Sequence, residues 1–128
     1  QNCRKFKRIN MSKFKLLSIN GFDQNKLRQF NITHDQSLIL RSIFVMINNN
    51  TDPNGNEYHN SIIDNGYIYY DIPQWDIIDS VPILNIKNKR TLQRLLKPLI
   101  EQGFIIKRPI ETKFWIRLNL DRLYPNKK

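Results

Sequence analysis

Apolar side chains recur at helical spacing in the last third of the chain. Five of them fall at relative positions 0, 3, 4, 7 and 8, which form one face of a helix: Leu92, Leu95, Leu96, Leu99 and Ile100. Asn88 suits the N-cap of this helix, and Gly103 suits the left-handed residue that follows it. Pro98 removes a hydrogen bond to the Arg94 carbonyl, so it should kink the helix. The pattern predicts an amphipathic helix with a buried leucine face.

A longer apolar segment precedes this helix. Thr33 and Gln36 have the spacing of a capping box, and residues 38–47 are apolar with two interruptions. A helix that is apolar around most of its girth lies at the centre of a domain. We therefore expect a central helix that begins after Thr33 and stops in the asparagines 48–50. A short helical turn is expected before it, over residues 24–30.

A third, short helix is predicted between these two. Asp71 would be its cap, Pro73 would lie in its first turn, and Gln74 would reach back toward the cap. Trp75 and Ile78, with Ile77 as a further candidate, give it a short apolar face. The segment is long enough for about two turns, and a tight connector joins it to the leucine-faced helix.

The remaining segments predict strands and loops. Residues 67–72 are rich in Tyr and Ile and predict a strand, whereas the polar residues 51–65 predict a long surface loop. After Gly103, a hairpin is expected from strands at 104–107 and 114–120, with Pro109 near its tip. The order of elements predicts an α+β fold of the winged helix-turn-helix type, with about three main helices and a C-terminal β-hairpin wing.

The chain has 128 residues, which suits one domain. We expect residues 1–12 to form a flexible basic arm and residues 13–128 to form the folded domain. The longest apolar run, at 43–47, is far shorter than the roughly 18 residues of a membrane span. Cys3 is the only cysteine, which excludes an internal disulfide and suits a reducing compartment. A cytoplasmic protein is expected.

Charge is segregated along the chain, whose formal net charge is +10. Residues 1–15 carry six basic and no acidic side chains, residues 16–86 carry three basic and eight acidic ones, and residues 87–128 carry twelve basic and three acidic ones. Two basic ends around an acidic middle favour a partner with patterned negative charge, and nucleic acid before others. The alternative is a lysine-rich surface that only maintains solubility.

The predicted leucine-faced helix directs its polar residues away from the core. Four cations and one amide occupy that outer side: Lys89, Arg90, Gln93, Arg94 and Lys97. A helix fits the major groove of DNA, where Arg and Lys can recognise guanine and Gln can recognise adenine. The free backbone N–H groups at the start of the helix could also bind a phosphate.

The segment 82–96, followed by Leu99, Gly103 and Phe104, resembles a known family. It is similar to the winged-helix domains that open phage and plasmid replication-initiation proteins of the DnaD-like and replisome-organizer type. The resemblance extends from about Ile32 to Tyr124, and this chain departs from the pattern at Pro98 and in residues 51–65. It implies sequence-specific binding of double-stranded DNA in replication initiation by a phage, plasmid or other mobile element.

The resemblance and the charges together assign the contacts. The groove helix would use eight residues: Lys87, Asn88, Lys89, Arg90, Thr91, Gln93, Arg94 and Lys97. The wing would use Lys107, Arg108, Lys113 and also Arg117. The arm would add phosphate contacts through Arg4, Lys5, Lys7 and Arg8. Double-stranded DNA is thus the expected partner, with a second copy or replication proteins as further partners and no membrane or small-molecule substrate.

Other functions were weighed against DNA binding. A metal-dependent nuclease would need a cluster among the acidic residues Asp71, Asp76 and Asp79 with Asp64 or Glu57, but capping and surface exposure account for these residues. No nucleophile motif, phosphate loop or zinc pattern is present, so no enzyme, metal or cofactor is expected. The tyrosines 67, 69 and 70 and Trp75 could stack on single-stranded bases or fill the core. A transcriptional regulator and a protein-interaction module remain alternatives.

Overall fold

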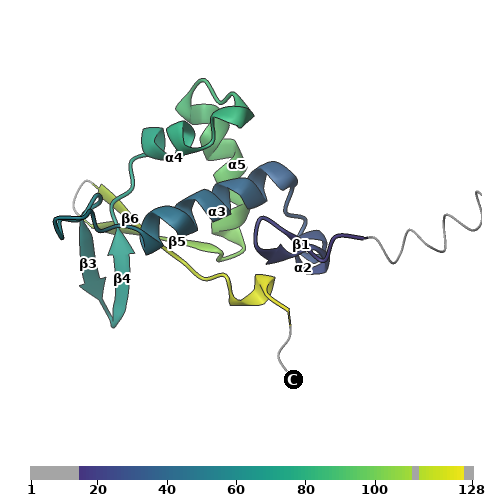
Figure 1. Ribbon diagram of the computed structural model, residues 1–128, viewed down its shortest axis with the longest axis horizontal. Helices are drawn as coiled ribbons and strands as arrows, with labels where there is room; N and C mark the ends of the chain where they lie inside the picture. Colours follow the sequence, from purple (N-terminus) through teal and green to yellow (C-terminus); the bar gives the residue numbers. More distant parts are fainter. Residues whose placement is uncertain (1–14, 111–112, 126–128) are drawn as a thin grey trace, which may run out of the picture.

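The computed structural model describes residues 15–110 and 113–125, and within these residues the fold is α+β, with helices packed against one face of a four-stranded antiparallel sheet and a separate two-stranded sheet (Figure 1). The predicted arm at 1–12 lies outside the described residues. The elements follow one another in this order: β1 (Ser18–Ile19), β2 (Phe22–Asp23), α2 (Gln24–Gln29), α3 (His34–Asn48), β3 (Ser61–Asp64), β4 (Tyr67–Tyr70), α4 (Gln74–Ser80), η1 (Pro82–Leu84), α5 (Lys89–Glu101), β5 (Ile105–Ile110), β6 (Lys113–Leu118) and η2 (Asp121–Leu123).

Helix α3 occupies the middle of the molecule, as its apolar sequence predicts (Figure 1). The predicted capping box is present, with the Thr33 hydroxyl accepting from the Gln36 backbone N–H at 3.1 Å. Ile39, Leu40 and Ile43 are fully buried in the core. Because the helix is apolar on several sides, it contacts both α4 and α5.

Helix α5 confirms the prediction from leucine spacing. Leu92, Leu96 and Leu99 are buried, and the Asn88 side chain caps the helix by accepting from the Thr91 backbone N–H at 2.9 Å. Gly103 adopts the expected positive φ of +83° just beyond the helix end. The α-helix continues on both sides of Pro98 and ends at Glu101. The buried leucines thus fix which side of α5 faces outward.

The sheet has the strand order β3-β4-β6-β5, all antiparallel. Strands β5 and β6 form six consecutive residue pairs, from Ile105↔Leu118 to Ile110↔Lys113. Strand β4 joins this hairpin through one pair, Tyr70↔Ile116. The inner sheet face, which includes Ile105 and Ile116, packs on the core beneath α3 and α5.

The prediction that residues 51–65 form only a loop is wrong. Residues Ser61–Asp64 form β3 and pair with β4 across the left-handed turn at Asn65 and Gly66. The buried Asn50 side chain holds the preceding segment, donating to the His59 carbonyl at 2.8 Å and accepting from the His59 N–H at 2.9 Å. A four-residue strand beside a polar turn carries too few apolar positions to stand out in the sequence.

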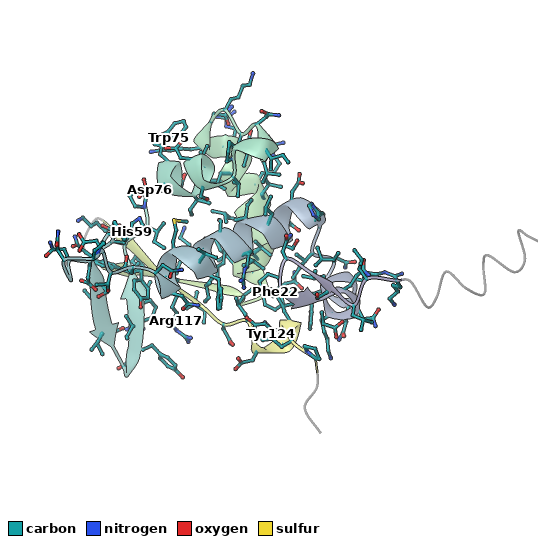
Figure 2. All side chains as sticks on the ribbon, viewed as in Figure 1. Phe22, His59, Trp75, Asp76, Arg117 and Tyr124 are labelled. Atoms are coloured by element: carbon teal, nitrogen blue, oxygen red, sulfur yellow. The ribbon has the colours of Figure 1, made fainter. Side chains whose placement is uncertain are left out.

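The predicted start of the short helix is also wrong. The N-cap of α4 is Pro73, without a side-chain hydrogen bond, because the chain stays extended up to that residue. Asp71 therefore lies too far before the first turn to cap it. The buried side of α4 consists of Ile77 and Ile78, whereas Trp75 is exposed (Figure 2).

The predicted C-terminal hairpin is present, but its first strand extends to Ile110 rather than to residue 107, and its second spans Lys113–Leu118 rather than 114–120. Arg108, Pro109 and Lys113 lie within the strands rather than in the turn, and Pro109 pairs with Phe114. Residues 111–112, at the tip, lie outside the described residues. Proline is tolerated in β5 because β5 is an edge strand, where a missing backbone N–H leaves no neighbour unpaired.

Candidate nucleic-acid interface

The outward side of α5 carries exposed cations. With about 100° between successive residues of an α-helix, Arg90, Arg94 and Lys97 lie roughly opposite Leu92. All three of these basic side chains are exposed. Among the described residues, none of them forms an ion pair with an acidic side chain. This face therefore presents uncompensated positive charge to a partner.

The start of α5 adds two further cations and an open helix N-terminus. Lys87 and Lys89 are exposed on either side of the cap, and the first turn contains no acidic residue. The side chains of Asn88 and Thr91 are engaged with each other, because the Asn88 Oδ1 atom also accepts from the Thr91 hydroxyl at 3.0 Å. We infer that these two residues shape the helix start and that the lysines carry its charge.

A cleft of about 730 Å³ lies between α5, the start of α4 and the β5–β6 hairpin. Its polar rim includes Lys89, Gln93, Lys97 and Lys107, so residues predicted for the groove helix and for the wing meet there. Asp71 and Glu101 also line it. The Gln93 side chain donates to the Gln74 Oε1 atom across the cleft at 3.1 Å.

Two of the predicted wing cations are engaged with carboxylates of the same chain. Arg108 forms an ion pair with Asp64 of β3, and the Lys113 Nζ atom lies 3.4 Å from an Asp71 oxygen. The four side chains keep between 23% and 57% of their surface exposed. The cations keep about half of their surface in solvent, which screens these pairs, so a phosphate could compete for either cation.

Arg117, the remaining cation of the predicted wing, packs against tyrosine side chains of the sheet. Its Cζ atom lies over the Tyr67 ring at 3.8 Å from the centroid and 5.8 Å from that of Tyr69, and its buried Nε has no hydrogen-bond partner among the described residues. Tyr69 is buried, whereas Tyr67 and Trp75 are exposed. Arg117 therefore does not join the cations of α5. The predicted arm residues lie outside the described residues: Arg4, Lys5, Lys7 and Arg8.

The acidic residues considered for a metal site are dispersed over separate contacts. Asp76 lies 2.7 Å from the His59 Nε2 atom, while Asp64 and Asp71 face the hairpin cations (Figure 2). Over residues 15–110 and 113–125, no group of three or more His, Cys, Asp or Glu side chains could hold a metal ion. We derive no metal chemistry from these residues.

Sequence reasoning missed two contributions to this surface. It did not place Gln74 beside Gln93, because the two residues belong to different helices and share no local pattern. It also did not pair Arg108 and Lys113 with carboxylates of β3 and of the segment after β4. The absence of any Lys or Arg between residues 42 and 86 was the available signal that this part of the chain would supply counter-charges.

The chain matches no protein-family model, no curated protein and no solved structure. In the part of the chain that the structure describes, no helix is long and apolar enough to cross a membrane.

Proposed function

We propose that this chain is a winged-helix protein that binds double-stranded DNA in a sequence-specific manner. Helix α5 is its recognition helix, and the β5–β6 hairpin is its wing. The order of elements is compatible with this proposal: the central helix α3, the β3–β4 hairpin, the short helix α4, a tight connector, helix α5 and the β5–β6 hairpin. The pairing of β4 with β6 supports it, because it fixes the hairpin beside the two helices.

One observation carries the proposal. Leu92, Leu96 and Leu99 are buried, and Arg90 and Arg94 project from the opposite side of α5 without an acidic partner among the described residues. A core helix whose outer face only maintained solubility would gain from mixed charges, since neighbouring cations repel one another. Here, uncompensated cations are concentrated on a helix whose width fits a major groove.

In the proposed complex, α5 lies in the major groove and the wing reaches the neighbouring backbone. Arg90 and Arg94 contact base edges, where arginine favours the two acceptors of guanine. Lys89, Lys97 and Lys107, around the cleft, contact phosphates and set the register of the helix. Arg108 and Lys113 join them when phosphates displace their carboxylate partners.

The biological setting is proposed from the sequence resemblance alone. A protein similar to phage and plasmid replication-initiation proteins would recognise an origin in the cytoplasm. If so, the duplex sequence that it selects should occur in repeats near its own gene. A plasmid carrying those repeats and the gene should replicate in a suitable host, whereas a transcriptional regulator would bind the repeats without supporting replication.

Fluorescence anisotropy with labelled duplexes tests DNA binding. With about six to ten phosphate contacts, we expect affinity to fall roughly 10³- to 10⁵-fold between 50 and 200 mM salt. Arg94→Ala should weaken binding to the selected sequence about 5- to 150-fold. Arg28→Ala is the matched control, because it removes the same charge from the exposed side of α2. If wild-type protein bound no duplex at 50 mM salt, or if the two variants behaved alike, the proposal would be wrong.

A further inference from the structure

Gln93 differs from its neighbours on the outer side of α5 in two ways. It carries an amide where they carry cations, and a hydrogen bond to a residue of another helix sets the direction of its side chain. Its position, about 100° around the helix from Leu92, places it on the flank of α5 that faces the cleft. Its Nε2 atom donates to the Oε1 atom of Gln74 at 3.1 Å. Gln74, in the first turn of α4, is half-buried and has fewer accessible directions than a free surface side chain.

The hydrogen bond leaves the recognition edge of Gln93 available. A primary amide has two N–H groups and one carbonyl oxygen. One N–H bonds to the Gln74 Oε1 atom. When this is the N–H that points away from the Gln93 Oε1 atom, the second N–H remains beside that oxygen. These two groups form an adjacent donor and acceptor, and no other described side chain occupies either of them. The Gln74 contact therefore orients the amide without consuming the pair that a base would need.

We propose that Gln93 recognises adenine in the major groove and that Gln74 is the positioning residue for this contact. The proposal rests on the proposed DNA binding and assigns a base to one position of the interface. Adenine presents the N7 acceptor next to the N6 amino donor, which complements the donor and acceptor of a glutamine amide. Guanine presents two acceptors, so the Gln93 oxygen would face the guanine O6 atom without a proton between them.

The positioning role has a physical basis in side-chain entropy. A free glutamine side chain loses rotamer freedom when it is fixed, which opposes binding. A side chain that is already held by Gln74 loses less on binding, which favours the base that matches its fixed orientation. Gln74 touches no base in this arrangement, so its removal should relax base preference while leaving most of the affinity in place.

Selection of duplexes from a random library, followed by binding measurements, tests the base assignment. We expect the wild-type site to contain an adenine whose replacement by guanine weakens binding about 5- to 150-fold. Replacing the same adenine by 7-deazaadenine, which lacks the N7 acceptor, should weaken wild-type binding and leave Gln93→Ala unaffected. Gln29→Ala, at an exposed glutamine of α2, should keep the wild-type preference.

Two variants of Gln74 test the positioning role. Gln74→Leu keeps the volume but removes the acceptor, so it should reduce the preference for adenine over guanine at least threefold, with less than a twofold change in affinity for random duplexes. Gln74→Glu keeps an acceptor for Gln93, so it should retain the preference while its added charge weakens binding to every duplex. Thermal unfolding of each variant identifies any that fold poorly, and Gln74→Ala, which also lacks the acceptor, replaces Gln74→Leu if that variant does.

The outcomes separate this inference from the proposed function. If wild-type protein bound no duplex, DNA binding itself would be wrong. If it selected a sequence but Gln93→Ala selected the same one with equal preference, the adenine contact would be wrong and DNA binding would stand. If Gln93→Ala lost the preference for adenine while Gln74→Leu kept it in full, Gln93 would recognise the base on its own. The positioning role of Gln74 would then be wrong.

Discussion

Arg117 of β6 lies over the ring of Tyr67 of β4, with its Cζ atom 3.8 Å from the ring centroid. The contact crosses the junction between the two hairpins of the sheet, which is otherwise formed by the pair Tyr70↔Ile116. The guanidinium also approaches Tyr69, which is buried. Arg117 thus joins the two hairpins on the outer side of the sheet rather than contributing to the cationic face of α5.

We predict that Arg117→Ala lowers stability without impairing DNA binding. A partly desolvated cation–π contact contributes about 0.5–2 kcal/mol, so the free energy of unfolding should fall by that amount. Urea unfolding measures it, and Arg117→Lys should restore little, because lysine lacks the planar group that stacks. A variant with unchanged stability but a loss of affinity like that of Arg94→Ala would instead make Arg117 a DNA contact.

The carboxylates that pair with the wing cations should restrain DNA binding. Asp64→Asn and Asp71→Asn release Arg108 and Lys113 respectively. Each released cation can add about one phosphate contact, so the slope of log affinity against log salt should steepen by up to about 0.9. Binding titrations at several salt concentrations measure this slope. Asp121→Asn, an exposed site on η2, makes the same charge change and should leave the slope nearly constant.

If all three asparagine variants changed the slope equally, net charge alone would account for the effect. If none did, the hairpin would not reach the phosphates. Stability should change by less than about 1 kcal/mol in each case, because exposed ion pairs contribute little to folding.

Pro98→Ala should stabilise the domain. Proline within a helix is about 3 kcal/mol less favourable than alanine, and its stiffening of the unfolded chain offsets up to about 1 kcal/mol of that difference. The half-buried ring also loses some packing, so we expect a net gain of roughly 1–2 kcal/mol in urea unfolding. Glu101→Ala, at the end of the same helix, is a control with little expected effect. A loss of stability would mean that packing of the ring outweighs the missing hydrogen bond.

Gln36 should be more important for stability than its place in a capping box suggests. Its Oε1 atom accepts from the Thr33 N–H at 2.9 Å, and its Nε2 atom donates to the Leu95 carbonyl of α5 at 3.1 Å. The side chain is buried, so Gln36→Ala should cost about 1–3 kcal/mol in urea unfolding. Gln29→Ala, at an exposed site, should cost less than about 0.5 kcal/mol. Equal effects would show that the link to α5 adds nothing.

Local sequence signals predicted the two long helices well. The caps at Thr33 and Asn88 lie where the sequence places them, because capping depends on residues three positions apart. Signals that depend on neighbouring elements failed. Asp71 has the composition of a cap, yet the extended backbone at Pro73 moves the start of α4 two residues onward, and Asp71 faces Lys113 instead.

The candidate site also contains some features that local sequence signals predict and others that depend on neighbouring elements. The outward direction of Arg90 and Arg94 follows from the leucine period of one helix, so the sequence was enough to predict it. The partners of Arg108 and Lys113 lie more than 40 residues earlier in the chain. These residues come together only when the strands of the sheet pair, and no periodic pattern in the sequence predicts such a contact. The contact between Gln74 and Gln93 likewise depends on how two helices pack.

The β5–β6 hairpin holds six residue pairs within itself and shares one, Tyr70↔Ile116, with the rest of the sheet. Such a junction resists separation of the strands far more than it resists twisting between them. Ile105 and Ile116 hold the hairpin on the core, so we expect its outer part to twist about that point while α5 stays anchored by its leucines. A protein built this way could follow duplexes of different groove width, and part of its selectivity would then come from how easily each sequence deforms.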